Sequence, residues 1–117
     1  MRRSIFVVLV CLFMLAFSFA QSGHSVALAW NYPAATNITF RVFRSTTTGG
    51  PYSQINVNPI STLSYTDTTV LAATTYYYVV AAFDSSTSTQ SAYSNQISAT
   101  IPSAPVPPTN LTAPSVR

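Results

Sequence analysis

The longest alternating stretch of the chain reads Thr74-Thr-Tyr-Tyr-Tyr-Val-Val-Ala-Ala-Phe-Asp84. Successive side chains of an extended backbone point to opposite faces, so Tyr76 and Tyr78 would share one face and Tyr77 and Val79 the other. β-branched and aromatic residues of this kind favour pleated sheets. The stretch therefore predicts the longest strand of an all-β protein.

Shorter stretches with the same period of two occupy 25–31, 38–45, 52–57, 63–67 and 92–101. Turn-forming residues separate them, most clearly Gly49-Gly50-Pro51 and Asn58-Pro59. No stretch places apolar residues at helical spacing. A set of short strands without helices predicts a single antiparallel sandwich or barrel.

The first twenty residues have the layout of a secretory signal peptide. Met1-Arg2-Arg3 supplies a positive start, an apolar run follows over 5–17, and Ser18-Phe19-Ala20 offers small residues for cleavage. The alternative is a retained membrane anchor, but a helix over 5–20 would measure about 24 Å against a hydrocarbon core of ~30 Å. We therefore expect cleavage after Ala20. The mature chain would be secreted, to the extracellular space, the cell surface or the periplasm, with no attachment to the membrane.

The mature chain offers little material for catalysis. Cys11 leaves with the signal peptide, and the charged side chains that remain are Arg41, Arg44, Arg117, Asp67 and Asp84. They form no basic patch for nucleic acid, and both aspartates are interpreted as acceptors for turn amides. Nothing in the sequence places His24 beside a nucleophile. We therefore expect no enzyme activity, no metal and no cofactor.

The order of several motifs resembles a bacterial fibronectin type III domain from about Ser25 to Pro102. The motifs are Val26-Ala-Leu-Ala-Trp30, Phe40-Arg-Val-Phe-Arg44, Gly49-Gly-Pro-Tyr52, Ser64-Tyr-Thr-Asp67, Thr74-Thr-Tyr-Tyr-Tyr-Val-Val80 and Ser91-Ala-Tyr-Ser-Asn95. The resemblance implies an immunoglobulin-like antiparallel β-sandwich, in which the hydroxyl of Tyr76 bonds to backbone upstream. It also implies a core between two facing sheets that contains Leu28, Trp30, Val42, Tyr76 and Val80.

One strand of that family pattern is out of place. A complete domain opens with a strand before 25–31, but the mature chain has only 21–24 there, whereas Pro107-Pro-Thr-Asn-Leu-Thr-Ala113 resembles such a first strand. The chain thus divides into a signal peptide at 1–20, a sandwich at 21–101 and a Pro-rich tail at 102–117. Three alternatives stay open. The tail is a disordered remnant, it folds back onto the 25–31 strand of its own chain, or it pairs head-to-tail with the next molecule.

We expect the strands at 38–45 and 74–84 to be neighbours, and their outward face to be a candidate partner-binding surface. That face would carry Arg41, Phe43, Tyr77, Val79 and Phe83, and is more apolar than a wetted face requires. The alternative is the ordinary composition of an exposed strand. The sequence therefore predicts a secreted, non-catalytic structural, adhesion or protein-interaction module, with self-assembly through the tail as one option. The second hypothesis is a glycan-binding accessory domain of the kind found in bacterial extracellular polysaccharide-degrading proteins.

Overall fold

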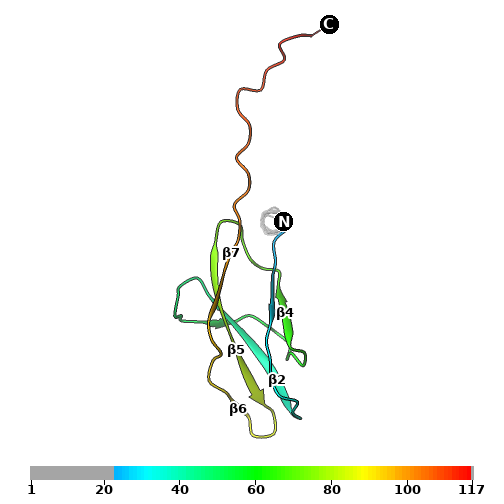
Figure 1. The fold of residues 1–117 in the computed structure, drawn as a ribbon, viewed down its shortest axis with the longest axis vertical. Helices are drawn as coiled ribbons and strands as arrows, with labels where there is room; N and C mark the ends of the chain where they lie inside the picture. Colours follow the sequence, from blue (N-terminus) through cyan, green and yellow to red (C-terminus); the bar gives the residue numbers. More distant parts are fainter. Residues whose placement is uncertain (1–22, 117) are drawn as a thin grey trace, which may run out of the picture.

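The computed structural model describes residues 23–116, so the expected signal peptide lies outside the described residues. Two antiparallel sheets face each other (Figure 1). The smaller sheet pairs β1 (Val26–Ala29) with β4 (Ser64–Asp67). The larger sheet has the order β3-β2-β5-β6, with β7 also paired to β5; these strands are Ser53–Gln54, Ile38–Ser45, Thr75–Asp84, Thr89–Gln90 and Ile97–Thr100. The predicted all-β antiparallel sandwich is confirmed.

β2 and β5 form the longest strand pair of the larger sheet. It runs without interruption from Ile38 opposite Asp84 to Ser45 opposite Tyr77. The family resemblance implies that these two strands are neighbours, and this prediction is confirmed. Among residues 23–116, we find no helix with the length and apolar character that a membrane crossing requires.

The core lies between the two sheets and draws on nearly every strand. Its buried members are Leu28, Phe40, Val42, Ile60, Val70, Tyr76, Tyr78, Ala82 and Ile101. Three of the five expected core residues, Leu28, Val42 and Tyr76, are in this set. Trp30 and Val80 are half-buried and pack against the core. Burial of this apolar surface is the main force that holds the two sheets together.

The stretches predicted at 52–57 and 92–101 are the most strongly shortened in the structure, because side chains take the place of backbone partners. The stretch predicted at 52–57 forms only β3, since the amide side chain of Asn56 takes over beyond it. Its Oδ1 accepts from the N–H of Val42 at 2.8 Å and its Nδ2 donates to the carbonyl of Phe40 at 3.4 Å. Within the stretch predicted at 92–101, only β7 pairs as a strand. In the segment before β7, the Oγ atoms of Ser94 and Ser91 accept from the backbone amides of Val80 and Ala82 in β5.

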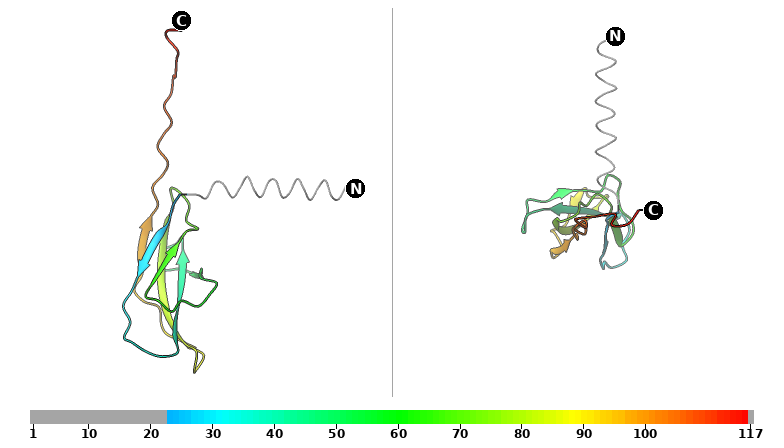
Figure 2. Two further views of the ribbon diagram at one scale, coloured as in Figure 1. Left: turned by 90° about the vertical axis from the view of Figure 1, so that its right-hand side faces the viewer. Right: turned by 90° about the horizontal axis from the view of Figure 1, so that it is seen from above.

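The tail after Ile101 has no regular secondary structure and extends away from the sandwich (Figures 1 and 2). Its apolar side chains are almost fully solvated, with Val106 87%, Leu111 95% and Val116 83% exposed. In the described part of the chain, β4 is the sole strand paired with β1. The alternative in which the tail folds back onto this strand of its own chain is therefore not the arrangement that the structure adopts.

Candidate interaction site

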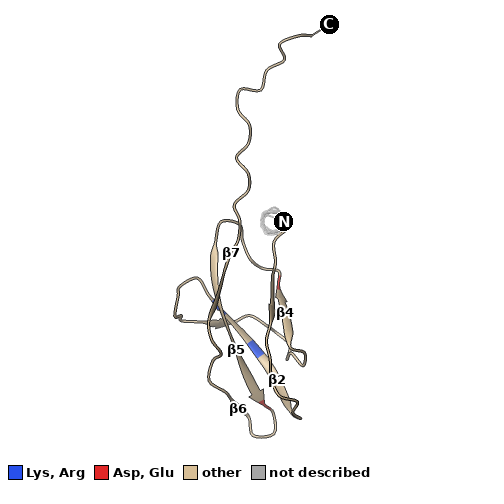
Figure 3. Cartoon of the chain, viewed as in Figure 1, with Lys and Arg blue, Asp and Glu red and all other residues tan. Residues whose placement is uncertain are grey.

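Figure 3 shows that charged residues occupy few positions along the described strands. Two of them form an ion pair between the sheets, in which Arg44 Nη1 donates to Asp67 Oδ2 at 2.8 Å. The hydroxyl of Tyr78 donates to the same oxygen at 2.8 Å, and Thr69 donates to Oδ1 through its N–H and its hydroxyl. The sequence interpretation of Asp67 as a turn acceptor covers only the Thr69 bonds. The carboxylate also ties β4 to β2 and β5, across the two sheets.

The surroundings of Asp67 favour its ionised form. Burial by itself would raise the pKa of the carboxyl group, but the hydrogen bonds from Thr69, Tyr78 and Arg44 outweigh it and lower the pKa below its ordinary value of 3.8. Burial and the bond to this carboxylate together raise the pKa of the Tyr78 phenol far above its ordinary range. The cluster therefore holds the two sheets together through fixed polar contacts, with a charged Asp67 and a neutral Tyr78 at neutral pH.

We expect acid to weaken the fold through Asp67. The folded-state pKa of this group is lowered, so its contribution to stability is present above pH 3.8 and is lost as the pH falls through the folded-state pKa. Urea midpoints measured between neutral pH and pH 2 should fall in that window, and Asp67→Asn should remove most of the slope. Asp84 is the other carboxylate side chain of the sequence, and Asp84→Asn is the matched control. Equal slopes for wild type and Asp67→Asn would contradict this assignment.

Tyr76 lies where the family resemblance implies. The side chain is 4% exposed, and its hydroxyl accepts a hydrogen bond from the N–H of Leu71 at 3.0 Å. Its ring also faces the guanidinium of Arg44 at 4.7 Å. We expect Tyr76→Phe to lower the free energy of unfolding by about 1–3 kcal/mol, because the part-buried N–H of Leu71 loses its acceptor. Denaturation in urea measures this loss, and an unchanged midpoint would show that water replaces the hydroxyl.

Two of the five residues of the expected partner-binding face are buried, which corrects the prediction of an outward apolar surface at those positions. Phe43 is 8% and Val79 3% exposed, and only Arg41, Tyr77 and Phe83 keep partial exposure. The physical reason is long-range. The irregular segment before β7 brings the ring of Tyr93 over Phe43 at 5.0 Å, and Tyr52 packs against Tyr93 at 5.4 Å. Arg41 lies over the Phe83 ring at 3.8 Å. Strand alternation carries no information about such a covering loop.

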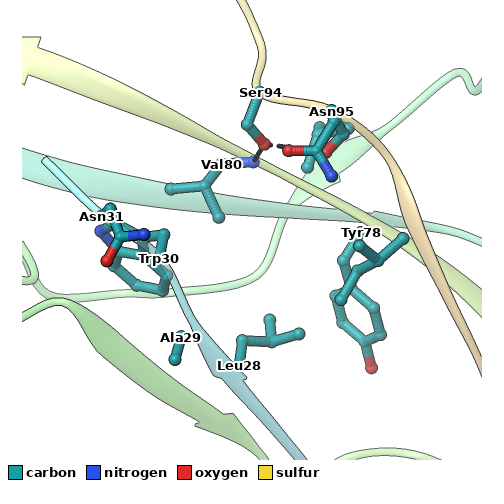
Figure 4. Close-up of a pocket in the computed structure, with 10 residues that line it drawn as sticks. Leu28, Ala29, Trp30, Asn31, Tyr78, Val80, Ser94 and Asn95 are labelled. Atoms are coloured by element: carbon teal, nitrogen blue, oxygen red, sulfur yellow. Dashed lines mark hydrogen bonds between the residues drawn. The ribbon is translucent and has the colours of Figure 1, made fainter.

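A slot opens instead on the side of the sandwich where β1 faces the segment that leads into β7. We call it the open-side slot; it is lined by Leu28, Ala29, Trp30, Asn31, Tyr78, Val79, Val80, Ser94, Asn95 and Ile97 and has a volume of about 380 Å³. Figure 4 shows the side chains of Leu28 and Trp30 facing those of Tyr78 and Val80. A smaller hollow of about 160 Å³, lined also by Tyr32 and Phe40, continues the slot past Trp30.

The position of Trp30 makes this slot unusual. Its ring packs edge-on against Phe40 at 5.4 Å, yet Nε1 is buried and has no hydrogen-bond partner among the described residues. A buried donor without an acceptor is costly, so native structures seldom keep one. The prediction from sequence assigned Trp30 a purely structural role. The sequence contains no signal for an unpaired nitrogen, since the missing acceptor is a property of the tertiary arrangement.

The two facing antiparallel sheets and the tyrosine bonded to upstream backbone define an immunoglobulin-like β-sandwich. No family model matches the chain, and no curated protein matches it. Among solved structures it is similar to a Fn3-like protein from Clostridium thermocellum, with 37% identity, 73% of this chain and 84% of that chain covered, and a TM-score of 0.57. The chain belongs to the fibronectin type III family.

Two further structures show how widely this sandwich is used. The chain is 25% identical to a β-1,2-glucanase from Parabacteroides distasonis over 69% of its own length, with a TM-score of 0.57, but spans only 11% of that enzyme. A fibronectin type III domain of a human protein is 20% identical, with 74% of this chain and 80% of that chain covered and a TM-score of 0.55. The human domain supports the fold alone.

Proposed function

We propose that the chain is a secreted, non-catalytic module that works through protein contacts, including contacts between its own copies. Secretion is supported by the charged start, apolar run and small residues of 1–20. The contact function is supported above all by one observation. The same chain has both an open slot lined by apolar side chains and a tail whose apolar side chains are exposed to solvent. Exposed apolar surface of this kind is typical of interaction sites.

Expression of the full chain with its first twenty residues, in a secreting bacterial host, tests this function. The intact mass of the recovered protein should correspond to a chain that starts at Gln21. Sedimentation velocity should then show species larger than one chain, in proportions that rise with protein concentration. A protein retained in cells at its full mass would contradict secretion, and a single monomeric species at every concentration would contradict self-contact.

The second candidate is a glycan-binding accessory domain. It is favoured by the similarity to a short part of a β-1,2-glucanase, together with the exposed rings of Tyr32 and Tyr93 at the continuation of the slot. Titration with β-1,2-glucan by calorimetry, and a pull-down on insoluble polysaccharides, separate the two functions. Saturable glucan binding that Tyr93→Ala weakens would favour the glycan reading, and the absence of binding to any polysaccharide would favour protein contacts.

A further inference from the structure

We propose that the open-side slot receives residues 109–113 of a second copy, which adds as a strand to the free edge of β1. This inference rests on the proposed self-contact and gives it a site. Three features of the molecule lead to it: the unpaired backbone of β1, the apolar slot beside it, and a tail segment with the matching length and character.

The free edge of β1 follows from its register with β4. Leu28 lies opposite Tyr65, and the N–H of Trp30 donates to the carbonyl of Leu63 at 3.0 Å. Alternate residues of an antiparallel pair direct both backbone groups to the same neighbour. The backbone groups of Leu28 and Trp30 therefore face β4, whereas those of Ala27 and Ala29 face the opposite side, where no strand within residues 23–116 pairs with them. An edge of this kind is a template for another strand.

The slot supplies what an added strand needs beyond backbone partners. Leu28, Trp30 and Ile97 present apolar surface, and Ile97 remains 45% exposed. The unpartnered Nε1 of Trp30 requires an acceptor, and an incoming strand brings a row of carbonyl oxygens close to it. The residues that line the slot carry no charge. The geometry thus favours an uncharged extended segment with an apolar side chain on its inner face.

The tail contains one segment of this description. Thr109, Asn110, Leu111, Thr112 and Ala113 all keep a backbone N–H, and Pro108 and Pro114 end the run at both sides. Leu111 is 95% exposed and would be the residue that enters the slot. Asn110 has a φ of 56°, outside the extended region, so the segment becomes a regular strand only when it pairs.

The tail of the same chain is poorly placed to fill the slot. It leaves the sandwich at the end where β1 begins and points outward (Figures 1 and 2). Four prolines between 102 and 108 stiffen the connection, which reaches about 22 Å at the polyproline rise of ~3.1 Å per residue. The segment is therefore held out from its own domain, within reach of a neighbour. Donor and acceptor lie on different surfaces, so the contact is head-to-tail and repeats from copy to copy.

Complementary variants of the secreted full chain test the site. Leu111→Asp removes the donor, and Ala29→Pro removes an N–H from the free edge without loss of a bond to β4. Ile97→Asp is a second acceptor variant for use if Ala29→Pro does not fold, and Val116→Asp is the matched control outside the segment. Each disabled variant alone should be monomeric, with a dissociation constant for self-association raised at least about tenfold. An equimolar mixture of a donor and an acceptor variant should form a one-to-one dimer, at low and at high salt.

The other outcomes overturn the inference in distinguishable ways. If wild type associates and the variants associate equally well, self-contact holds but the strand-addition site is wrong. The same conclusion follows if both variants are monomeric and their mixture stays so. If wild type is monomeric and Leu111→Asp lowers its thermal midpoint, the tail fills the slot of its own chain. If wild type is monomeric and Leu111→Asp changes nothing, self-contact fails together with the site.

Discussion

Replacement of Asp67 with alanine is expected to lower the free energy of unfolding by about 3–5 kcal/mol. The side chain is 2% exposed and accepts from Arg44, Thr69 and Tyr78. Its removal leaves the guanidinium of Arg44 unpaired between the sheets and deprives the buried Tyr78 hydroxyl of its acceptor. Both effects act on the folded state, because the unfolded chain hydrates these groups freely.

Urea denaturation followed by fluorescence measures this loss. Asp84→Ala is the matched control, since that carboxylate serves the turn after β5 through the N–H and hydroxyl of Ser86. Its midpoint should stay near that of wild type. Equal midpoints for Asp67→Ala and Asp84→Ala would show that the Arg44–Asp67 pair contributes nothing beyond a turn contact. The cluster around Asp67 would then not hold the two sheets together.

Truncation of Phe40 to alanine is expected to cost a similar amount, about 3–5 kcal/mol. Phe40 is 5% exposed, lies in the first half of β2, and makes edge-on contacts with the rings of Trp30 and Tyr32 at 5.4 and 5.2 Å. The cavity left by the ring would adjoin the smaller hollow that continues the open-side slot, so water can enter it.

The same urea titration gives the loss for Phe40→Ala, with Val57→Ala as the control. Val57 is 95% exposed, and its truncation should leave the midpoint unchanged. A loss below about 1 kcal/mol for Phe40→Ala would mean that the sheets close over the cavity, and the core between them would be softer than its close packing implies.

Strands governed by local alternation were predictable from the sequence. The bounds of β2 agree with the prediction at both ends, and those of β5 differ by one residue, because both strands are long and pair with each other. β3 and β7 were overextended, because the Asn56 amide and the Ser91 and Ser94 hydroxyls satisfy backbone groups that strand partners would otherwise satisfy. The alternation of side chains in the sequence does not show whether backbone groups bond to a neighbouring strand or to side chains.

The interaction site was harder to predict from the sequence than the strands were. The part-buried ion pair had a signal in the sequence, since Arg44 lies on the same face of its strand as Phe40 and Val42 and so needed a partner on the facing sheet. The cover that Tyr93 gives to Phe43 had none, since it depends on the path of an irregular segment. The displaced strand-like tail was visible, but the slot beside β1 emerged only from the packing of two sheets.

Amide hydrogen exchange on the secreted protein, at concentrations above and below self-association, tests the central claim most directly. Register gives an internal comparison within β1, because Leu28 bonds to β4 in every state whereas Ala27 and Ala29 face the free edge. The account predicts that the amides of Ala27 and Ala29 become protected together as the protein associates, while the amide of Leu28 is protected throughout. Association that leaves the amides of Ala27 and Ala29 in rapid exchange would contradict it.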